Sequence, residues 1–311
     1  MAERVVDWNG VWRPESEARV SIYDLSVMQA AAAFEMTRSF GGVSFKVREH
    51  LLRLMASCRL LRMPCPWSLD YLTERCLACQ AANQPAMRAD DEHRLLIVVS
   101  PGCAPMYRDV AGALTAPWYY IADFPLRWTT HGLGCGFTEG VPAVTSVIRQ
   151  VPDACVPSQA KHRSRLHFHL AQQRTPAGIW PVLVSPVSHA DGTTDDYVTE
   201  APGANLVAVH QRRISVCAWN CLAGISAATV QTLVPTTRDT DPTLTWISQA
   251  DELWLTGTPF CMLPVVNLDG QPIGEGRPGP VYRETLAKWN ALVGLDIAGQ
   301  IAAWDSAASP N

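Results

Sequence analysis

The chain has 311 residues, of which 48% are hydrophobic and 17% charged, and this balance favours a globular protein with a large buried core. Its formal net charge of −4 provides no strong field for nucleic acid or an anionic membrane, so we expect neither as a partner. No apolar run approaches the roughly 18 residues that cross a bilayer. The N-terminus lacks the hydrophobic segment of a signal peptide, which predicts a cytoplasmic protein.

The ten cysteines are scattered along the chain and do not form a metal-binding pattern. Cys76 and Cys79 make a CxxC pair inside a helix-like run, but no second CxxC is present to complete a zinc site. We interpret both as buried free thiols and expect no metal.

The first part of the chain predicts strands and helices in mixed order. Asn9-Gly10 lies between apolar residues and indicates a hairpin. Hydrophobic spacing predicts helices over residues 45–62 and 69–82. The run Leu-Leu-Ile-Val-Val-Ser at 95–100 predicts a buried strand, and a further strand is expected over 118–122.

Glycines cluster between residues 129 and 137, and such a cluster is typical of a connection between domains. We place the hinge at residues 126–137. This division predicts a small N-terminal domain of residues 1–125 and a large domain of residues 138–311, with mixed strands and helices that include a C-terminal helix over 281–293.

The segment 160–171, Ala-Lys-His-Arg-Ser-Arg-Leu-His-Phe-His-Leu-Ala, is interpreted as a helix that Lys161 opens. Leu166, Leu170 and Ala171 would form an apolar stripe, with Lys161 at its inner edge. Partial desolvation there would lower the pKa of the lysine and free its amine to attack a carbonyl. The alternative is an ordinary solvated start of a basic helix.

Three segments carry groups suited to an anion such as phosphate. Arg53, on a leucine-rich helix, would offer a bidentate fork, unless it is an ordinary surface arginine. Gly224-Ile225-Ser226 precedes a helix, whose first N–H groups attract anions, although a serine there can equally be a simple N-cap. Thr256-Gly257-Thr258 adds two hydroxyls at a strand end.

One carboxylate is placed where it would suit a cationic ring. Glu200 ends the strand-like run Tyr-Val-Thr-Glu before a tight turn. A carboxylate beside a protonated ring nitrogen makes a charge-assisted hydrogen bond that holds the proton in place. Without a ligand, Glu200 would simply be a solvated turn residue.

Together these segments resemble the class IV, or fold-type IV, pyridoxal-phosphate enzymes, which include branched-chain and D-amino acid aminotransferases and aminodeoxychorismate lyase. The similarity extends from about Val5 to Asp296 and implies a two-domain α+β fold with the cofactor in the interdomain cleft. The most specific matching motifs, in chain order, are Phe34-Glu-Met-Thr-Arg38, His50-Leu-Leu-Arg53-Leu, Lys161 with the segment after it, Tyr-Val-Thr-Glu200-x-x-Gly-x-Asn205-Leu206, Gly224-Ile225-Ser226 and Thr256-Gly-Thr258-Pro-Phe-Cys-Met-Leu-Pro264-Val265.

The resemblance implies a pyridoxal 5'-phosphate site in which each residue has a role. Lys161 would condense with the cofactor aldehyde and later move a proton, and Glu200 would keep the pyridine nitrogen protonated. Leu222 would pack on the face of the ring. The phosphate would be bound by Arg53, Ile225, Ser226 and Thr258.

The same resemblance places the substrate near Phe34, Arg38, Arg94 and Pro259. Arg94 aligns loosely with a substrate-carboxylate arginine of branched-chain enzymes, while surface or structural roles stay open for Arg38 and Arg94. The implied function is transfer of an amino group between an amino acid, with hydrophobic or branched-chain substrates as the leading hypothesis, and a 2-oxo acid. The implied assembly is a homodimer.

The chain also departs from the family pattern. Residues 29–33 replace a glycine-rich stretch that lines the substrate pocket in relatives, Ala227 stands where an arginine commonly follows the phosphate motif, and Leu166 replaces a tyrosine of some branched-chain enzymes. A lyase on the same scaffold is one alternative, because Lys161 and Glu200 would serve it equally. A degenerate protein that binds without turnover is another.

Overall fold

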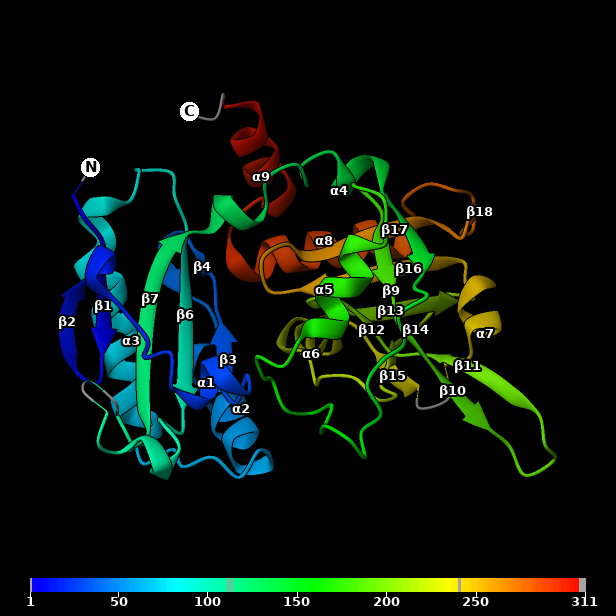
Figure 1. The fold of residues 1–311 in the computed structure, drawn as a ribbon. Coiled ribbons are helices and arrows are strands. Elements are labelled where there is room, and N and C mark those ends of the chain that lie inside the picture. Colours follow the sequence, from blue (N-terminus) through cyan, green and yellow to red (C-terminus); the bar gives the residue numbers. More distant parts are fainter. Residues whose placement is uncertain (1, 111, 113, 240–241, 308–311) are drawn as a thin grey trace. The chain divides into compact units, whose positions relative to one another are not determined.

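The computed structural model describes residues 2–110, 112, 114–239 and 242–307. The described residues fall into two compact units: unit 1 is Met1–Thr129 with Gln159–Arg165, and unit 2 is Thr130–Ser158 with Leu166–Asn311. Each unit is described by itself (Figure 1). The domain boundaries expected from the sequence stay predictions. None of the described helices combines the length and the apolar character needed to cross a membrane.

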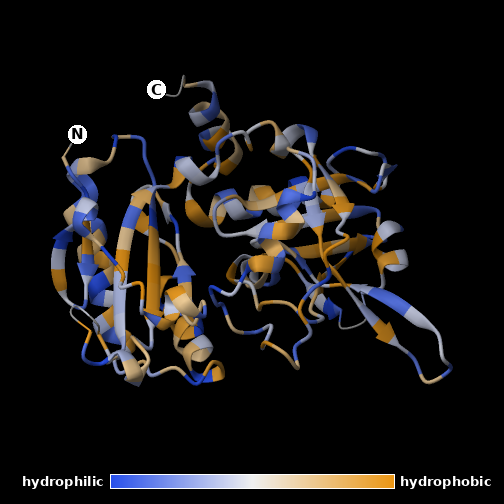
Figure 2. Cartoon of the chain, viewed as in Figure 1, coloured by the Kyte–Doolittle hydropathy of each residue, from blue (hydrophilic) through white to orange (hydrophobic). Residues whose placement is uncertain are grey.

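Unit 1 is built on an antiparallel sheet, and its described residues form five strands in the order β2-β1-β7-β6-β3 (Figure 1). The predicted hairpin is confirmed: Asn9 and Gly10 connect the first two strands with φ values of 51° and 85°. The interior strand β6 is hydrophobic along most of its length (Figure 2). These strands are β1 (Val5–Trp8), β2 (Val11–Pro14), β3 (Ala33–Met36), β6 (His93–Ser100) and β7 (Trp118–Pro125).

Two helices, α2 (Val47–Leu60) and α3 (Leu69–Asn83), cover one face of this sheet and confirm the predicted helices. Leu51, Leu54 and Leu72 are fully buried against alternate residues of β6, because a helix face and one face of a strand present apolar side chains at matching spacings. The short elements of unit 1 are α1 (Leu25–Met28), β4 (Ser39–Phe40), β5 (Val43–Ser44) and 3-10 turns at Glu15–Glu17, Gln84–Ala86, Pro105–Tyr107 and Leu126–Thr129.

Cys76 and Cys79 lie on the buried face of α3 and are both inaccessible to solvent, as predicted for buried thiols. Burial raises the pKa of Cys79 to about 12 and that of Cys76 still further. Both sulfurs are therefore protonated at neutral pH and serve as small hydrophobic groups.

Unit 2 contains a mixed sheet in which the described residues form nine strands, with the main path β15-β14-β13-β16-β17-β8-β9. The pairs β14–β15, β17–β8 and β8–β9 are parallel, and β12 and β18 add to β13 and β17. The strands are β8 (Val141–Thr145), β9 (Trp180–Val182), β12 (Glu200–Ala201), β13 (Ala204–His210), β14 (Arg213–Cys217), β15 (Thr236–Asp239), β16 (Glu252–Gly257), β17 (Cys261–Leu268) and β18 (Gln271–Pro272).

Helices α6 (Ile225–Leu233) and α8 (Pro280–Val293) pack on β16 and on each other, and α8 confirms the predicted C-terminal helix. A hydrophilic ribbon of β10 (Val184–Ser188) and β11 (Thr194–Val198) extends from the unit (Figure 2). The other helices of unit 2 are α4 (Gly136–Glu139), α5 (Leu166–Gln173), α7 (Leu244–Ser248) and α9 (Ile297–Ser306).

The segment around Lys161 differs from the prediction. Helix α5 begins only at Leu166, so Lys161 does not open it. Residues 161–163 are extended and pair with the edge strand β3, where the N–H of Phe34 donates to the C=O of Lys161 at 3.0 Å. The backbone N–H and C=O groups at the edge of a sheet bind this segment, because they would otherwise lack hydrogen-bond partners.

The apolar stripe predicted after Lys161 is also wrong. Leu166 and Leu170 are 68% and 38% exposed, and only Ala171 of the three is buried. Leu166 and Leu170 therefore provide no apolar surface that desolvates Lys161. Lys161 belongs to unit 1 instead.

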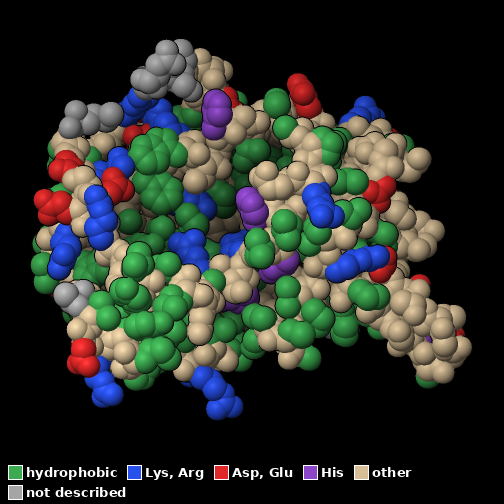
Figure 3. All heavy atoms as spheres, in the orientation of Figure 1, with side chains coloured by type: hydrophobic (Ala, Val, Ile, Leu, Met, Phe, Trp, Pro, Cys, Tyr) green, Lys and Arg blue, Asp and Glu red, His purple; other side chains and the backbone are tan. Residues whose placement is uncertain are grey.

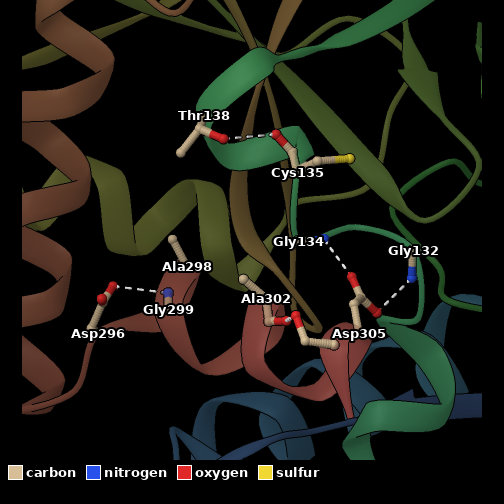
Figure 4. Close-up of a pocket in the computed structure, with 10 residues that line it drawn as sticks. Gly132, Gly134, Cys135, Thr138, Asp296, Ala298, Gly299, Ala302 and Asp305 are labelled. Carbon is tan, nitrogen blue, oxygen red and sulfur yellow. Dashed lines mark hydrogen bonds between the residues drawn. The ribbon is translucent and has the colours of Figure 1, made fainter. Parts of the chain in front are cut away.

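The glycine-rich segment of unit 2 is fastened to α9. The Asp305 carboxylate accepts hydrogen bonds from the N–H groups of Gly132 and Gly134 at 2.8 and 2.7 Å (Figure 4). A Cβ at Gly134 would lie 2.7 Å from the Cα of Ala302, so glycine is required for this close approach.

We expect Leu54→Ala to lower the free energy of unfolding by about 2–5 kcal/mol, because it leaves a cavity in the interior of unit 1. Leu52→Ala, on the same helix but at a position 52% exposed, is the matched control and should change stability by no more than about 0.5 kcal/mol. Urea denaturation measures both. Equal losses for the two variants would contradict the helix orientation described above.

Candidate active site

Lys161 is held by backbone contacts on two sides. Its N–H donates to the hydroxyl of Ser57 at 2.9 Å, and its C=O accepts from Phe34 on β3. Ser57, fully buried on α2, donates in turn to the C=O of Arg53 at 2.8 Å. The amine nitrogen Nζ lies 4.9 Å from the centroid of the Phe34 ring. The backbone of the lysine is thus fixed to a strand and a helix at once.

The guanidinium of Arg53 forms a bidentate ion pair with a buried carboxylate. Its Nε and Nη2 donate to Glu35 at 2.6 and 2.9 Å, and Nδ1 of His50 lies 2.8 Å from the same carboxylate. Burial opposes ionisation of Glu35, but Arg53 and His50 outweigh it and hold the pKa of the carboxyl well below its usual range. Arg53 is therefore not an ordinary surface arginine, and its role toward phosphate stays a prediction.

Arg38 and Arg94 are both buried, which excludes a surface role for either. Arg38 donates from Nε to the C=O of Ser39 at 3.1 Å and lies 3.8 Å from the centroid of Phe40. Arg94 is 7% exposed, its Nη2 contacts the sulfur of Met36 at 3.6 Å, and its Nε and Nη1 have no hydrogen-bond partner in the described part of the chain. Burial, with Arg38 nearby, lowers the pKa of Arg94 to about 9.

An arginine that is buried with two unsatisfied donors is costly unless an anion completes it. Arg94 still carries its charge at neutral pH, since a pKa of about 9 is above that value. Its planar fork suits a carboxylate. The geometry thus supports a carboxylate-binding role for Arg94.

In unit 2, Glu200 is 8% exposed, so the alternative of a solvated turn residue is wrong. Gln150 donates from its side-chain amide to one carboxylate oxygen at 2.9 Å, and the N–H of Leu222 donates to the other at 3.4 Å. These contacts orient the carboxylate and connect it to the loop that carries Leu222.

The N-terminus of α6 lacks a side-chain cap. Gly224 is the N-cap residue and Ser226 lies inside the first turn, so the simple serine N-cap considered from the sequence is wrong. The first N–H groups of the helix, with the hydroxyl of Ser226, thus form a positive helix end of the kind that binds anions.

Asn205 connects the predicted site residues of unit 2, a role that the sequence analysis did not assign to it. It pairs across the sheet with Glu200 and with Thr256, and its side-chain amide donates to the C=O of Leu222 at 2.7 Å. A Cβ on Gly224 would collide with the Asn205 side chain. The spacing Glu-x-x-Gly-x-Asn is the signal, because a two-residue turn places the first and last residues side by side.

Of the two hydroxyls predicted at the end of β16, the buried one of Thr256 donates to the C=O of Asn205 at 3.4 Å. Thr258 follows the strand and is half-buried, as is Pro259. The hydroxyl available for a ligand is therefore that of Thr258.

Each unit gathers part of the predicted site. Unit 1 holds Phe34, Arg38, Arg53, Arg94 and Lys161, and unit 2 holds Glu200, Leu222, Ile225, Ser226, Thr258 and Pro259. A cavity of about 680 Å³ in unit 2 is distinct from this site, because its lining comes from the glycine-rich segment and α9 and includes none of these residues (Figure 4).

Comparison with known proteins supports the same family. The family model for amino-transferase class IV matches residues 32–268, and the chain belongs to this family. Branched-chain-amino-acid aminotransferase-like protein 2 of Arabidopsis thaliana is 28% identical over 293 residues, which cover 90% of this chain and 48% of the plant protein. The chain thus spans about half the length of this relative.

Solved structures share the fold. The branched-chain amino acid aminotransferase of Escherichia coli has a TM-score of 0.77 at 23% identity, covering 94% of this chain and 95% of its own. A T.th. branched-chain amino acid aminotransferase, complexed with N-(5'-phosphopyridoxyl)-L-glutamate, has a TM-score of 0.75 at 21% identity and covers 98% of both chains. At these identities the likeness establishes the α+β fold of this enzyme class.

Replacing Arg53 with methionine tests the buried network. The Glu35 carboxylate then loses its bidentate cation, and such uncompensated burial typically destabilises a fold by about 3–5 kcal/mol. In the wild type the folded-state pKa of Glu35 is below the usual 4.5, so its stabilising contribution is present above that pH and is lost as the pH falls through the folded pKa. In the variant, burial raises the pKa, and protonation relieves the penalty.

The difference in unfolding free energy between wild type and Arg53→Met should therefore shrink from pH 7 to pH 5, measured by urea denaturation of cofactor-free protein. The control is Arg48→Met on the same helix, whose ion pair with Asp70 is exposed and is worth at most about 1 kcal/mol. A penalty for Arg53→Met that does not change with pH would contradict the network.

Proposed function

We propose that this chain is a pyridoxal 5'-phosphate-dependent aminotransferase that moves an amino group between an amino acid and a 2-oxo acid. The observation that carries the proposal is that, within a class IV family match, Lys161 is fixed on the edge of β3 and Glu200 is buried and oriented by hydrogen bonds. A scaffold that had lost turnover would have no chemical need for either arrangement.

The residues present fit this cofactor by the chemistry of their side chains. Lys161 supplies an amine for the aldehyde, and Glu200 supplies a carboxylate for the ring nitrogen. The uncapped N-terminus of α6, with the hydroxyls of Ser226 and Thr258, supplies donors for a phosphate dianion. When bound, pyridoxal phosphate provides an electron-withdrawing ring that acidifies the substrate Cα.

The roles of the chain's own residues follow from their contacts. Lys161 would bind the cofactor and then hold and move the proton that leaves Cα. Glu200, oriented by Gln150 and Leu222, would keep a proton on the ring nitrogen. Leu222 would pack on the ring, and Arg53 and Ile225 would support the phosphate. Arg94 would bind a substrate carboxylate, with Phe34 and Arg38 of the same unit contacting the substrate, and Pro259 of unit 2 is a further proposed substrate contact.

Hydrophobic or branched-chain amino acids are the leading substrates of the proposal. They are supported by the names of the relatives and by the buried apolar residues Phe34, Phe260 and Met262. A homodimer is supported by hydrophobic side chains gathered over the lower part of unit 1 (Figure 3) and by the exposure of Ile22, Val27 and Met28. A cytoplasmic location stays a prediction.

Lys161→Ala should abolish both the visible absorbance of the bound cofactor and the transfer of the amino group, while urea denaturation shows an intact fold. The chain has only three lysines, Lys46, Lys161 and Lys288, which makes a direct test possible. Borohydride reduction of the loaded enzyme, followed by peptide mass spectrometry, should place the pyridoxyl group on Lys161. Its appearance on Lys46 or Lys288 instead would remove the assignment, and Lys288→Ala serves as the matched control.

Glu200→Gln should keep the cofactor bound but slow proton abstraction at Cα by about 100-fold or more, because a neutral amide holds the ring nitrogen proton poorly. Stopped-flow measurement of the amino-acid half-reaction, with cofactor content determined separately, checks both parts. Turnover at the wild-type rate would show that Glu200 has another role.

A donor and acceptor screen separates this function from its rivals. Transamination requires both an amino acid and a 2-oxo acid, whereas a lyase releases a keto acid such as pyruvate with no acceptor present. A degenerate protein would stay colourless with added cofactor. Release of a keto acid without an acceptor would therefore replace the proposed function with a lyase.

A further inference from the structure

Helix α2 of unit 1 ends in a turn that returns the chain toward the helix. The N–H of Met63 donates to the C=O of Cys58 at 2.8 Å. The N–H of Arg62 donates to the C=O of Arg59 at 3.1 Å, and Arg62 itself has a φ of 54°. Two such bonds around a left-handed residue define a Schellman motif, which reverses the direction of the chain. The residues after Met63 are therefore turned back toward the buried face of α2.

This reversal brings a second cysteine onto Cys58. The side chain of Cys65 packs on the buried cluster of unit 1 that contains Cys58, and the two thiols are hydrogen-bonded to each other. Pro64 and Pro66 flank Cys65, and a residue between two prolines is restricted to extended backbone conformations. The contact between the two sulfurs is thus set by the turn and by the prolines.

The two thiols differ in access and in ionisation. Cys58 is fully buried, whereas Cys65 is only half-buried, so a small solute can reach it. The hydrogen bond from Cys58 lowers the pKa of Cys65, and the backbone N–H of Trp67 and the charge of Arg59 act in the same direction. The same hydrogen bond, together with burial, raises the pKa of Cys58. Since oxidants react with the thiolate, Cys65 is the reactive member of the pair.

We infer that Cys65 and Cys58 form an oxidation site for hydroperoxides, in which Cys65 reacts first and Cys58 then closes a disulfide. The Cys65 thiolate attacks the O–O bond and takes one oxygen as a sulfenic acid, while the other oxygen leaves and is protonated to water or an alcohol. The sulfur of Cys58 next attacks the sulfur of Cys65. The S–O bond breaks, the proton of Cys58 moves to the departing oxygen, and water is released.

This reaction balances without a further reactant, because two thiols lose two electrons and one hydroperoxide gains them. A disulfide needs its sulfurs about 2 Å apart, and two thiols that are already hydrogen-bonded require only a short approach. The site belongs to unit 1 alone and does not depend on the proposed amino transfer.

Unit 1 also contains a matched control pair. Cys76 and Cys79 are close in sequence, but both are inaccessible to solvent, and burial keeps both protonated at neutral pH. We expect neither to react with a peroxide while the protein is folded. Cys135 and Cys155 of unit 2 are exposed and report the general reactivity of accessible thiols.

Peptide mass spectrometry tests the inference directly, because trypsin cleaves between the two cysteines. It releases Cys58 in residues 54–59 and Cys65 in residues 63–75. Folded, reduced protein is treated with an equimolar amount of hydrogen peroxide, its remaining thiols are blocked with N-ethylmaleimide in denaturant, and it is digested without reductant. The two peptides should appear joined, with the loss of two hydrogen atoms, and should separate with dithiothreitol. Cys76 and Cys79 should both carry the blocking group.

Two variants separate the steps. Cys65→Ser should abolish the joined peptide and leave Cys58 as a thiol, because Cys58 is inaccessible. Cys58→Ala should leave the sulfenic acid on Cys65 for capture by dimedone, because the second thiol is missing. Should Cys58→Ala fail to fold, the wild-type digest and Cys65→Ser, at a half-buried position, decide the question.

The inference is wrong if Cys65 stays a thiol in treated wild type, or if it proceeds to a sulfinic acid and no joined peptide forms. A disulfide between Cys76 and Cys79 at the same yield as the joined peptide would also contradict it, because oxidation would then follow unfolding of unit 1.

Discussion

The pairing of residues 161–163 with the edge of β3 is the contact on which the candidate site of unit 1 depends. Two backbone hydrogen bonds and the hydroxyl of Ser57 hold Lys161 in an extended segment. From this fixed backbone the Nζ lies 4.9 Å from the centroid of the Phe34 ring. The same pairing positions Arg163, so one structural element places both Lys161 and the neighbouring guanidinium.

In unit 2, the buried carboxylate of Glu200 and the N-terminus of helix α6 are held in a fixed arrangement. Asn205 does this from the middle of the sheet, through strand pairs to Glu200 and Thr256 and a hydrogen bond to the loop at Leu222. A side chain at position 224 would collide with Asn205, so glycine is required there. Glu200, the loop at Leu222 and Thr256 are therefore connected through one residue, Asn205.

The sequence predicted the elements whose signals are local. The helices α2 and α8 and the hairpin at Asn9-Gly10 follow from hydrophobic spacing and turn chemistry, and the family motifs led to Lys161 and Glu200. The prediction was wrong where contacts between distant residues determine the structure. The spacing of Leu166 and Leu170 is typical of an amphipathic helix, but the residues before them pair with an open strand edge.

The Arg53–Glu35 pair was missed for a related reason. Nothing in a single sequence shows that a glutamate on a strand and an arginine on the next helix face each other inside the core. The exposure of Arg38 and Arg94 was likewise open in the sequence, because long basic side chains occur on surfaces and in buried sites alike.

The composition of unit 1 has a consequence for synthesis on the ribosome. The last segment of unit 1, Gln159–Arg165, is synthesised some thirty residues after Thr129, where the main part of the unit ends. Until then the edge of β3 has no partner on that side, and an unpaired edge is a template for association with other chains. A nascent chain that ends before residue 159 is therefore prone to association, and the segment that carries Lys161 covers the edge of β3.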